Sequence, residues 1–369
     1  MHVSRLDLRD FRSHARAELE LADGITVLEG PVGAGKTNLI EALHVGCTGR
    51  SFRTSNEREL IRFGTQTARV RLCVDVAGVE HTTEVVLQSR GPKSVRRDGA
   101  RVTHPQAGDP PLFVCVFAPD HLELVKGPAG GRRARMDDFT AMIWPARRGT
   151  RASYTKALSQ RNALLGRVRA RAAGPESLHV WDRELARHGI ELMEHRRDLA
   201  AALAEPFTRR AAELGLPTPA EIAYRPRSAA SSSEELEAEL RERLDSDLER
   251  GFTQHGPHRD DLALRADTRD LRRYGSQGQQ RLGLLALLLA ERDVLRSMRD
   301  TSPVMLLDDV LSELDPDRRA SLLGTLGTPG QTLISTADES TVPAGVGAAW
   351  LRIRPSEDGD FQQRSAEIA

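Results

Sequence analysis

The segment from Gly30 to Thr37 has residue types and spacing suited to phosphate chemistry. It reads Gly30-Pro31-Val32-Gly33-Ala34-Gly35-Lys36-Thr37, with Asn38 directly after it. Glycines let backbone N–H groups curl around phosphate oxygens, and a helix that begins at this loop adds partial positive charge. Lys36 is expected to reach the β and γ phosphates of a nucleotide, and the Thr37 hydroxyl to bind Mg²⁺. The segment therefore predicts a P-loop that binds ATP together with Mg²⁺.

Two adjacent carboxylates provide the second part of a nucleotide site. The run Val304-Met305-Leu306-Leu307 is apolar and ends in Asp308 and Asp309. An apolar strand ending in acid is the Walker B pattern, in which Asp308 would hold Mg²⁺ directly or through water. Asp309 would orient or deprotonate the attacking water. Together with the P-loop, the pattern predicts ATP hydrolysis, with Asp309 and Lys36 as catalytic residues.

A second phosphate-binding device precedes a strongly apolar helical segment, Leu282 to Leu295. The sequence Ser276-Gln277-Gly278-Gln279 places a hydroxyl and a glycine amide at the expected start of that helix. It resembles the signature motif of ABC-type ATPases, usually written LSGGQ, which contacts the γ-phosphate bound by the partner subunit. A plain helix N-cap is the alternative interpretation. Ser312 to Asp315, directly after the Walker B pattern, resembles the D-loop of the same superfamily.

Two departures argue against a transporter ATPase. Those proteins carry a switch histidine after the strand that follows Walker B, whereas this chain reads Ile334-Ser335-Thr336-Ala337-Asp338. They also carry a Q-loop glutamine, whose place after Leu112 to Phe117 is taken here by Ala118-Pro119-Asp120-His121. Asp120 is the nearest polar candidate for the Q-loop role.

The elements that would position these motifs alternate between strand and helix at both ends of the chain. Gly24 to Glu29 predicts a buried strand and Thr37 to Cys47 a helix. Apolar or alternating patterns predict further strands at Arg69–Val76, His81–Leu87, Leu112–Phe117, Val304–Leu307 and Gln331–Thr336. Neither end has enough strands for a sheet of its own, so we expect the two ends to fold together as one head.

The middle of the chain has a different character. From about residue 130 to 250 the sequence shows long helical periodicity rich in Ala, Leu, Arg and Glu, interrupted by Pro, Gly and Ser. The order of elements predicts an α/β fold with a mixed β-sheet and helices in a head at 1–125 and 251–369, and the motif resemblances imply that this head is of the ABC-type ATPase class. An inserted helical arm domain would occupy 126–250.

Charge is distributed unevenly although the formal net charge is zero. Between Lys126 and Arg171 there are twelve basic and two acidic residues, a net charge of +10, whereas Glu234 to Arg250 has eight acidic and three basic residues, a net charge of −5. Solvated helix faces would explain either run, but a block of +10 also suits a phosphate-backbone surface. Contact with DNA through this block, including Arg132, Arg133 and Arg135, is one of two open interpretations.

The composition argues against a membrane protein and against a disulfide-bonded or zinc-binding protein. The longest apolar stretch, near Leu282 to Ala290, falls short of the roughly 20 residues of a membrane span, so we expect a cytoplasmic protein without membrane contact. The three cysteines, Cys47, Cys73 and Cys115, lie far apart in apolar contexts, which favours buried thiols over a disulfide or a zinc site.

Four segments make a family resemblance specific. They are Leu8-Arg9-Asp10-Phe11-Arg12-Ser13, Phe117 to Leu122, Gly256-Pro257-His258-Arg259-Asp260-Asp261, and Leu307 to Asp315. Together they resemble the RecF family of DNA replication and repair proteins, over essentially the whole chain. His255, His258, Asp260 and Asp261 have the donor types of a metal site, but a packed turn where the arm re-enters the head, or a lid near the nucleotide, suits the family better.

The resemblance implies a head similar to those of SMC and DNA-repair ABC ATPases, with a short helical arm in place of a long coiled coil. It implies an ATP-driven homodimer that binds double-stranded and gapped DNA and acts with RecO and RecR to help load RecA. Aspartate at 309 in place of the usual glutamate suggests slow hydrolysis. Three alternatives remain: a transporter motor subunit, a monomeric P-loop kinase, which leaves Ser276 to Gln279 unused, and a structural DNA-binding protein with a vestigial site.

Overall fold

The computed structural model describes residues 1–103, 112–326, 330–354, 360–362 and 367–368. The chain divides into two compact units. The sheet unit comprises Met1–His121, Glu213–Gly215 and Glu291–Ala369, and the helical unit comprises Leu122–Ala212 and Leu216–Ala290. Among the described residues, no helix combines the length and apolar character needed to cross a bilayer.

One sheet of the sheet unit is mainly parallel. Its strand order is β16-β14-β3-β13-β12-β8, and β14, β3, β13, β12 and β8 run parallel while β16 is antiparallel to β14. Both β12 and β13 are buried along their whole length, as expected for strands covered on both faces. The strands are β3 (Ile25–Glu29), β8 (Val114–Phe117), β12 (Val304–Asp308), β13 (Thr332–Thr336), β14 (Ala349–Arg352) and β16 (Glu367–Ile368).

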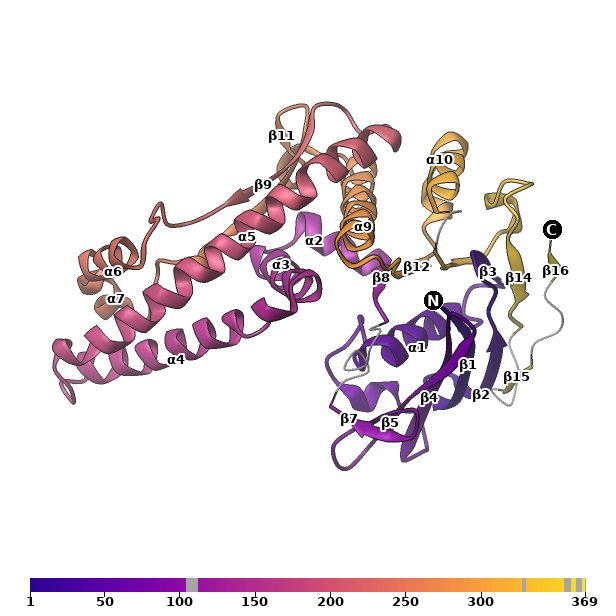
Figure 1. Ribbon diagram of the computed structural model, residues 1–369, viewed down its shortest axis with the longest axis horizontal. Coiled ribbons are helices and arrows are strands. Elements are labelled where there is room, and N and C mark those ends of the chain that lie inside the picture. Colours follow the sequence, from indigo (N-terminus) through magenta and orange to yellow (C-terminus); the bar gives the residue numbers. More distant parts are fainter. Residues whose placement is uncertain (104–111, 327–329, 355–359, 363–366, 369) are drawn as a thin grey trace. The chain divides into compact units, whose positions relative to one another are not determined.

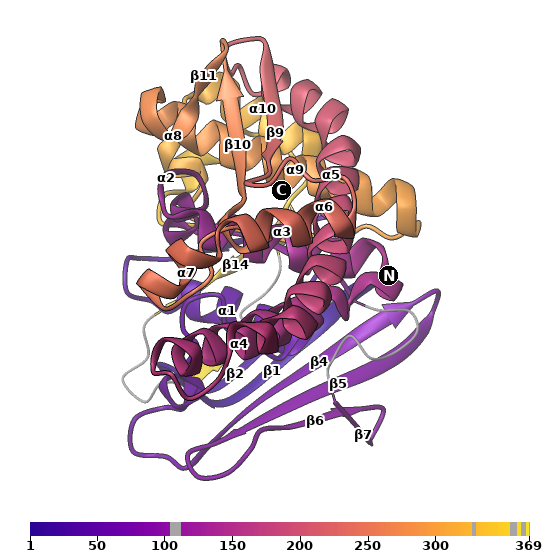
Figure 2. The same cartoon turned by 90° about the vertical axis from the view of Figure 1, so that its left-hand side faces the viewer.

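The second sheet of this unit is mainly antiparallel, with the order β15-β2-β1-β4-β5-β6-β7. Figure 2 shows β1, β4, β5 and β6 running side by side. The alternation of buried and exposed residues along β4 and β5 is that of a sheet with one face on the core. The strands are β1 (His2–Phe11), β2 (His14–Glu20), β4 (Thr67–Val76), β5 (Val79–Gln88), β6 (Ser94–Arg97), β7 (Ala100–Val102) and β15 (Asp360–Gln362).

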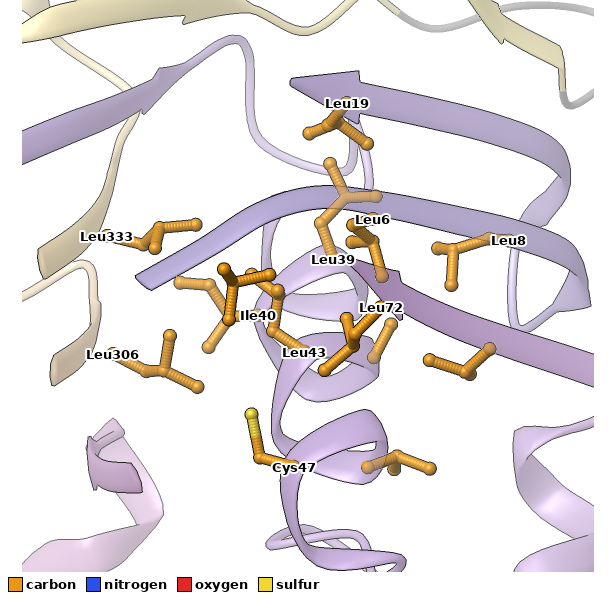
Figure 3. Close-up of a cluster of buried hydrophobic side chains, with 14 of the residues drawn as sticks. Leu6, Leu8, Leu19, Leu39, Ile40, Leu43, Cys47, Leu72, Leu306 and Leu333 are labelled. Atoms are coloured by element: carbon orange, nitrogen blue, oxygen red, sulfur yellow. The ribbon is translucent and has the colours of Figure 1, made fainter. Parts of the chain in front are cut away.

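Helix α1 (Lys36–Thr48) contacts strands of both sheets and carries the core of the unit. Its residues Leu39, Ile40 and Leu43 are at most 1% exposed. Figure 3 shows them between Leu6, Leu8 and Leu72 of the antiparallel sheet and Leu306 and Leu333 of the parallel sheet. Burying a leucine or isoleucine side chain contributes about 1.5–3 kcal/mol, so this cluster fixes the helix that follows the predicted P-loop.

Helix α10 (Pro316–Leu326) follows β12 after the short helix η6 (Leu311–Glu313). It is capped by Asp315, whose carboxylate accepts a hydrogen bond from the Arg318 N–H at 3.0 Å. The Ser321 hydroxyl donates to the carbonyl of Glu213 at 2.9 Å, where helix α5 ends. Other short helices in this unit are η1 (Glu57–Leu60) and η7 (Glu339–Thr341), and η2 (Pro119–Leu122) begins in it.

The helical unit is dominated by α4 (Thr150–Arg169) and α5 (His179–Glu213), which Figure 1 shows joined at one end by a short connection. They pack through an apolar cluster in which Tyr154 and Ala157 of α4 meet Leu185 and Leu192 of α5. The other helices are α2 (Glu123–Lys126), α3 (Ala129–Ile143), η3 (Pro145–Arg147), η4 (Pro175–Leu178), α6 (Ser233–Glu242), α7 (Leu244–Arg250), η5 (Pro257–Arg259), α8 (Leu271–Tyr274) and α9 (Gln277–Arg299), of which α9 ends in the sheet unit.

A charged triad is buried inside the helical unit. Arg161 of α4 is 0% exposed and donates to Asp182 at 2.6 Å and to Asp247 at 2.6 Å. It also donates to the Thr253 hydroxyl at 2.7 Å. The triad thus joins α4, α5, α7 and the chain after α7, because a buried guanidinium needs both carboxylates to offset its loss of hydration.

The predicted strands and helices are present, but several strands were not predicted, and one of these lies where a helix was expected. Strand β9 (Ala220–Arg225) lies within the region interpreted as helical and pairs with β10 (Asp261–Ala266), which also pairs with β11 (Arg269–Asp270). Residues after 250, as far as Ala290, belong to the helical unit. The division into a head at 1–125 and 251–369 and an arm at 126–250 stays a prediction. All three cysteines are free and buried, as expected.

Candidate nucleotide-binding site

The loop between β3 and α1 has the backbone shape that its glycines allow. Gly33 and Gly35 have φ values of 85° and 93°, in the left-handed region that glycine adopts without strain. A Cβ on Gly35 would lie 2.6 Å from His14 Nε2, and one on Gly30 would lie 2.3 Å from the Ile353 carbonyl. The loop is therefore held so close to its neighbours that side chains are excluded at these positions.

Lys36 lies at the first turn of α1 with its ammonium turned back over the loop. Its Nζ donates hydrogen bonds to the carbonyls of Gly30 at 2.6 Å and Pro31 at 2.9 Å. Burial lowers the pKa of Lys36 from its usual value, against the attraction of Asp309 and Asp308, which raises it. The side chain thus provides a positive charge at the centre of the loop.

The predicted Walker B carboxylate meets the P-loop hydroxyl directly. Thr37 Oγ1 lies 3.0 and 2.9 Å from the two carboxylate oxygens of Asp308, which is 5% exposed at the end of β12. A hydroxyl and a carboxylate are oxygen ligands of the kind that Mg²⁺ prefers. The donor set therefore fits the predicted Mg²⁺ site.

Asp309 follows as an exposed residue with a φ of 51°, so the backbone leaves the strand conformation at this residue. It lines a cavity of about 240 Å³ together with residues of the P-loop. The residues lining this cavity are Val32, Gly33, Gly35, Lys36, Thr37, Asn38, Asp308, Asp309, Ser335 and Ala337. The P-loop and Walker B pattern thus form one cavity that has a cation and two carboxylates in its wall.

Ser335 is a site residue that sequence reasoning did not assign. Its hydroxyl donates to Asp308 at 2.6 Å and accepts from the backbone N–H of Asp309 at 2.9 Å, so it orients both acids. It is the second of the five residues compared with the switch region of transporter ATPases, and Ala337 lines the cavity two residues later. Its place at the carboxyl end of a predicted strand, β13, was the available signal.

A buried ion pair supports the back of the P-loop helix and was also missed. Glu41 of α1 is 0% exposed and accepts from Arg12 at 2.9 and 2.8 Å and from Arg53 at 3.2 Å. Burial alone would raise the pKa of Glu41, but hydrogen bonds from Arg12 and Ser51 outweigh it and hold the pKa below its usual value. Asn38 lies beside this pair, accepting from Arg53 at 3.1 Å. Arg12 belongs to one of the segments that carried the family resemblance, which was its only signal.

The signature-like segment forms a complete cap of α9 in the helical unit. Ser276 Oγ accepts from the N–H of Gln279 at 3.2 Å, and Gln279 Oε1 accepts from the N–H of Ser276 at 2.9 Å, the reciprocal pattern of a capping box. Ser276, Gln277 and Gly278 are exposed. The Ser276 hydroxyl therefore acts as a helix cap within its own chain, and the exposed N-terminus of α9 is accessible to a second protein chain.

The remaining candidates have local roles. Ser312 of the D-loop-like segment donates to the Asp309 carbonyl at 2.9 Å, and Asp315 caps α10. Asp120, the proposed Q-loop equivalent, is exposed in η2 and does not line the cavity around the P-loop.

The histidine and aspartate cluster around Gly256 has structural partners in the helical unit. His258 lies 2.7 Å from the Tyr154 hydroxyl and 3.0 Å from the Thr253 carbonyl, and Asp260 accepts from Arg196 at 3.1 Å. His255 pairs with Glu239 at 2.5 Å and Asp261 with Arg132 at 2.7 Å. Over the described part of the chain, no grouping of His, Cys, Asp and Glu suits a metal ion. The cluster is a packed turn.

The burial of His258 predicts a pH-dependent stability. Burial lowers the pKa of His258 to about 4, compared with about 6.5 for an unfolded histidine. The unfolded chain therefore binds the proton first, so stability is full above about pH 6.5 and falls as the pH drops toward 4, by about 3 kcal/mol at most. We expect His258→Gln to show a flatter pH dependence of the unfolding free energy, measured by urea denaturation. His179→Gln, at an exposed position, should keep the wild-type slope, and equal slopes for both variants would contradict the assignment.

Comparisons with known proteins agree with this geometry. Residues 5–107 match the model of a family described as AAA domain. Two curated relatives named DNA replication and repair protein RecF, from Anaeromyxobacter sp. and Acidothermus cellulolyticus, are each 38% identical over 94% of this chain and cover 95% and 96% of the relative. A solved RecF structure with ATP is 28% identical, with a TM-score of 0.86 over 99% of this chain and 98% of the other.

A more distant similarity concerns the fold alone. An Smc head is 15% identical with a TM-score of 0.58, over 99% of this chain and 97% of the other. Together these similarities confirm the expected ABC-type ATPase head with mixed sheets and helices.

Proposed function

The chain belongs to the RecF family of DNA replication and repair proteins, and on that premise we propose that it is a DNA-binding ATPase whose active form is a homodimer closed around ATP. The observation that carries the proposal is the contact of Thr37 with both carboxylate oxygens of Asp308, which joins the P-loop and Walker B in one cavity. Structures of relatives described as RecF-ATP support ATP as the nucleotide.

In this mechanism the chain's own residues bind and orient the triphosphate. The backbone amides of Gly33 and Gly35 would donate to the phosphates. The Lys36 ammonium, which donates to two loop carbonyls in the structure, would donate to the β and γ phosphate oxygens instead. Thr37 and Asp308 would hold Mg²⁺, which neutralises phosphate charge when bound. Asp309 orients a water and accepts its proton as the water oxygen bonds to the γ phosphorus and the bond to the leaving ADP breaks. Aspartate reaches less far than glutamate, which supports slow turnover.

The exposed cap of α9 supports a site completed by a second chain. Ser276 and the first-turn amides of α9 would contact the γ-phosphate held by the partner subunit, since a helix N-terminus favours negative charge. ATP then contributes binding energy only to the closed dimer, so nucleotide controls the dimer population. We further propose that the closed dimer recognises double-stranded and gapped DNA in the cytoplasm and acts with RecO and RecR to help load RecA. Relatives described as recombination mediators of the RecFOR pathway support this role.

The proposal is tested by ATP hydrolysis per molecule across a protein concentration series, with and without gapped duplex DNA. We expect specific activity to rise with protein concentration and again with DNA. A flat rate that ignores DNA would instead favour a monomeric P-loop kinase.

Mixing two inactive variants gives a sharper test of the shared site. Lys36→Ala and Ser276→Arg should each abolish hydrolysis, because every site in either homodimer lacks one half. A heterodimer of the two has one site with both changes and one intact site. An equimolar mixture is therefore expected to recover roughly a quarter of wild-type activity if subunits exchange freely. No recovery, with subunit exchange verified by labelled chains, would contradict a composite site.

A further inference from the structure

The structure separates the basic block between Lys126 and Arg171 into engaged and free side chains. Arg132 is held by Asp261 at 2.7 Å and Arg161 by the buried triad. Arg133 donates to the Asp260 carbonyl at 2.7 Å, Arg147 pairs with Asp198 at 2.8 Å, and Arg151 pairs with Asp138 at 2.9 Å. These arginines organise the helical unit itself. Much of the +10 charge is thus already neutralised within the chain.

Two of the remaining basic residues, Lys156 and Arg167, lie on one face of α4. Residues Lys156, Gln160, Ala163 and Arg167, called the α4 stripe below, are spaced four, three and four positions apart, so they lie on one side of the helix. All four are exposed. Within the described residues, neither Lys156 nor Arg167 has an ion-pair partner within 4.0 Å. The stripe therefore presents two uncompensated cations to solvent.

The surroundings of the α4 stripe favour close approach by a polyanion. Helix α4 contains no aspartate or glutamate along its 20 residues. Exposed neighbours are small, including Ala152, Ser159 and Gly166, so they leave the backbone accessible. Lys156 and Arg167 are separated by about 16 Å along the helix, given a rise of 1.5 Å per residue. That separation lets the two long side chains reach different phosphates of one nucleic-acid backbone.

We propose that the α4 stripe is a contact surface for the phosphate backbone of duplex DNA. Phosphate contacts position a protein without reading sequence, and lysine and arginine are the side chains that make most of them. A single strand is less suited, because stacking needs exposed aromatic rings and the one aromatic residue of α4, Tyr154, is 3% exposed. A protein partner would need an apolar centre, which these small and polar residues do not supply. The inference rests on the proposed DNA-binding function and assigns it a surface.

The test is equilibrium binding of the full chain with ATP to a fluorescein-labelled duplex of about 30 base pairs, between about 50 and 200 mM salt. The slope of log K against log salt is negative, and each lost phosphate contact reduces its magnitude by about 0.9. We expect Lys156→Ala/Arg167→Ala to reduce the magnitude of the slope by about 1.8 and to weaken binding roughly tenfold at the middle of the salt range. Lys156→Arg should bind like the wild type.

The matched control is Arg187→Ala/Arg241→Ala, which removes the same charge from exposed helix positions of the helical unit. Arg187 and Arg241 are paired with Glu184 and Glu237 at 2.8 and 2.9 Å, so the control slope should stay near wild type. If the wild type binds duplex DNA and the α4 variant keeps the wild-type slope and affinity, the α4 stripe is not the contact surface. The proposed DNA-binding function would be unaffected by that result. Wild type that binds no duplex would overturn both. Thermal unfolding of each variant verifies folding, and hydrolysis without DNA should be unchanged.

Discussion

Asp309→Asn is expected to convert the chain into a stable ATP-bound dimer whose rate of ATP hydrolysis is at least roughly 100-fold below that of the wild type. Asparagine cannot accept the proton of the attacking water, and general-base catalysis typically contributes about 10²–10⁴-fold. The N–H of residue 309 still donates to Ser335 at 2.9 Å, so the local backbone should be kept. Because binding is retained and opening needs hydrolysis, the closed state should accumulate.

The measurement is the dimer fraction by analytical ultracentrifugation with ATP and with ADP, combined with phosphate release. Asp308→Asn is the informative comparison, since it weakens the contact with Thr37 and should lose the ATP-dependent dimer as well as hydrolysis. Asp309→Asn being no more dimeric with ATP than the wild type would count heavily against a hydrolysis-gated clamp.

Arg161→Ala is expected to destabilise the helical unit by about 3–5 kcal/mol. The change leaves Asp182 and Asp247 buried without their cation, since Arg161 contacts both at 2.6 Å. Whole domains are stable by only about 5–15 kcal/mol, so a loss of this size should lower the midpoint of unfolding strongly. It should be followed by urea denaturation with the circular dichroism of the helices as the signal.

Arg187→Ala provides the control for an exposed pair on α5. Arg187 also contacts a carboxylate, Glu184, but both side chains are exposed to solvent, and such surface pairs contribute little to stability. If Arg161→Ala and Arg187→Ala both lowered the free energy of unfolding by a similar small amount, water would have to reach the carboxylates around Arg161. That result would contradict the burial of the triad.

Much of the nucleotide site was predictable because its parts are local in sequence. A glycine-rich loop needs neighbouring residues to form its curve, and an apolar run ending in acid shows where a strand stops. Ser335 and Glu41 could not be assigned in the same way. Ser335 matters only because β13 lies parallel to β12 in the sheet, and Glu41 only because Arg12 and Arg53 return to α1 from elsewhere in the chain.

The fold shows the same division between local and distant information. Helix α1 and strands β12 and β13 have patterns that are complete within each segment. Strand β9 was missed because its six residues are stabilised as a strand by pairing with β10, about 40 residues later, inside a region of helical composition. Charge patterning located the basic block, but only the contacts of each arginine distinguish internal ion pairs from the α4 stripe.

Helix α5 is 35 residues long, about 50 Å, and contains Pro206; the carbonyl of its C-terminal residue Glu213 accepts a hydrogen bond from Ser321 of α10. Helix α10 itself begins at the D-loop-like segment that follows Asp309. Proline has no backbone N–H to donate, so Pro206 interrupts the hydrogen-bond ladder of α5 shortly before Glu213. We therefore expect a displacement of α10 to be absorbed at Pro206 rather than transmitted along the full length of α5.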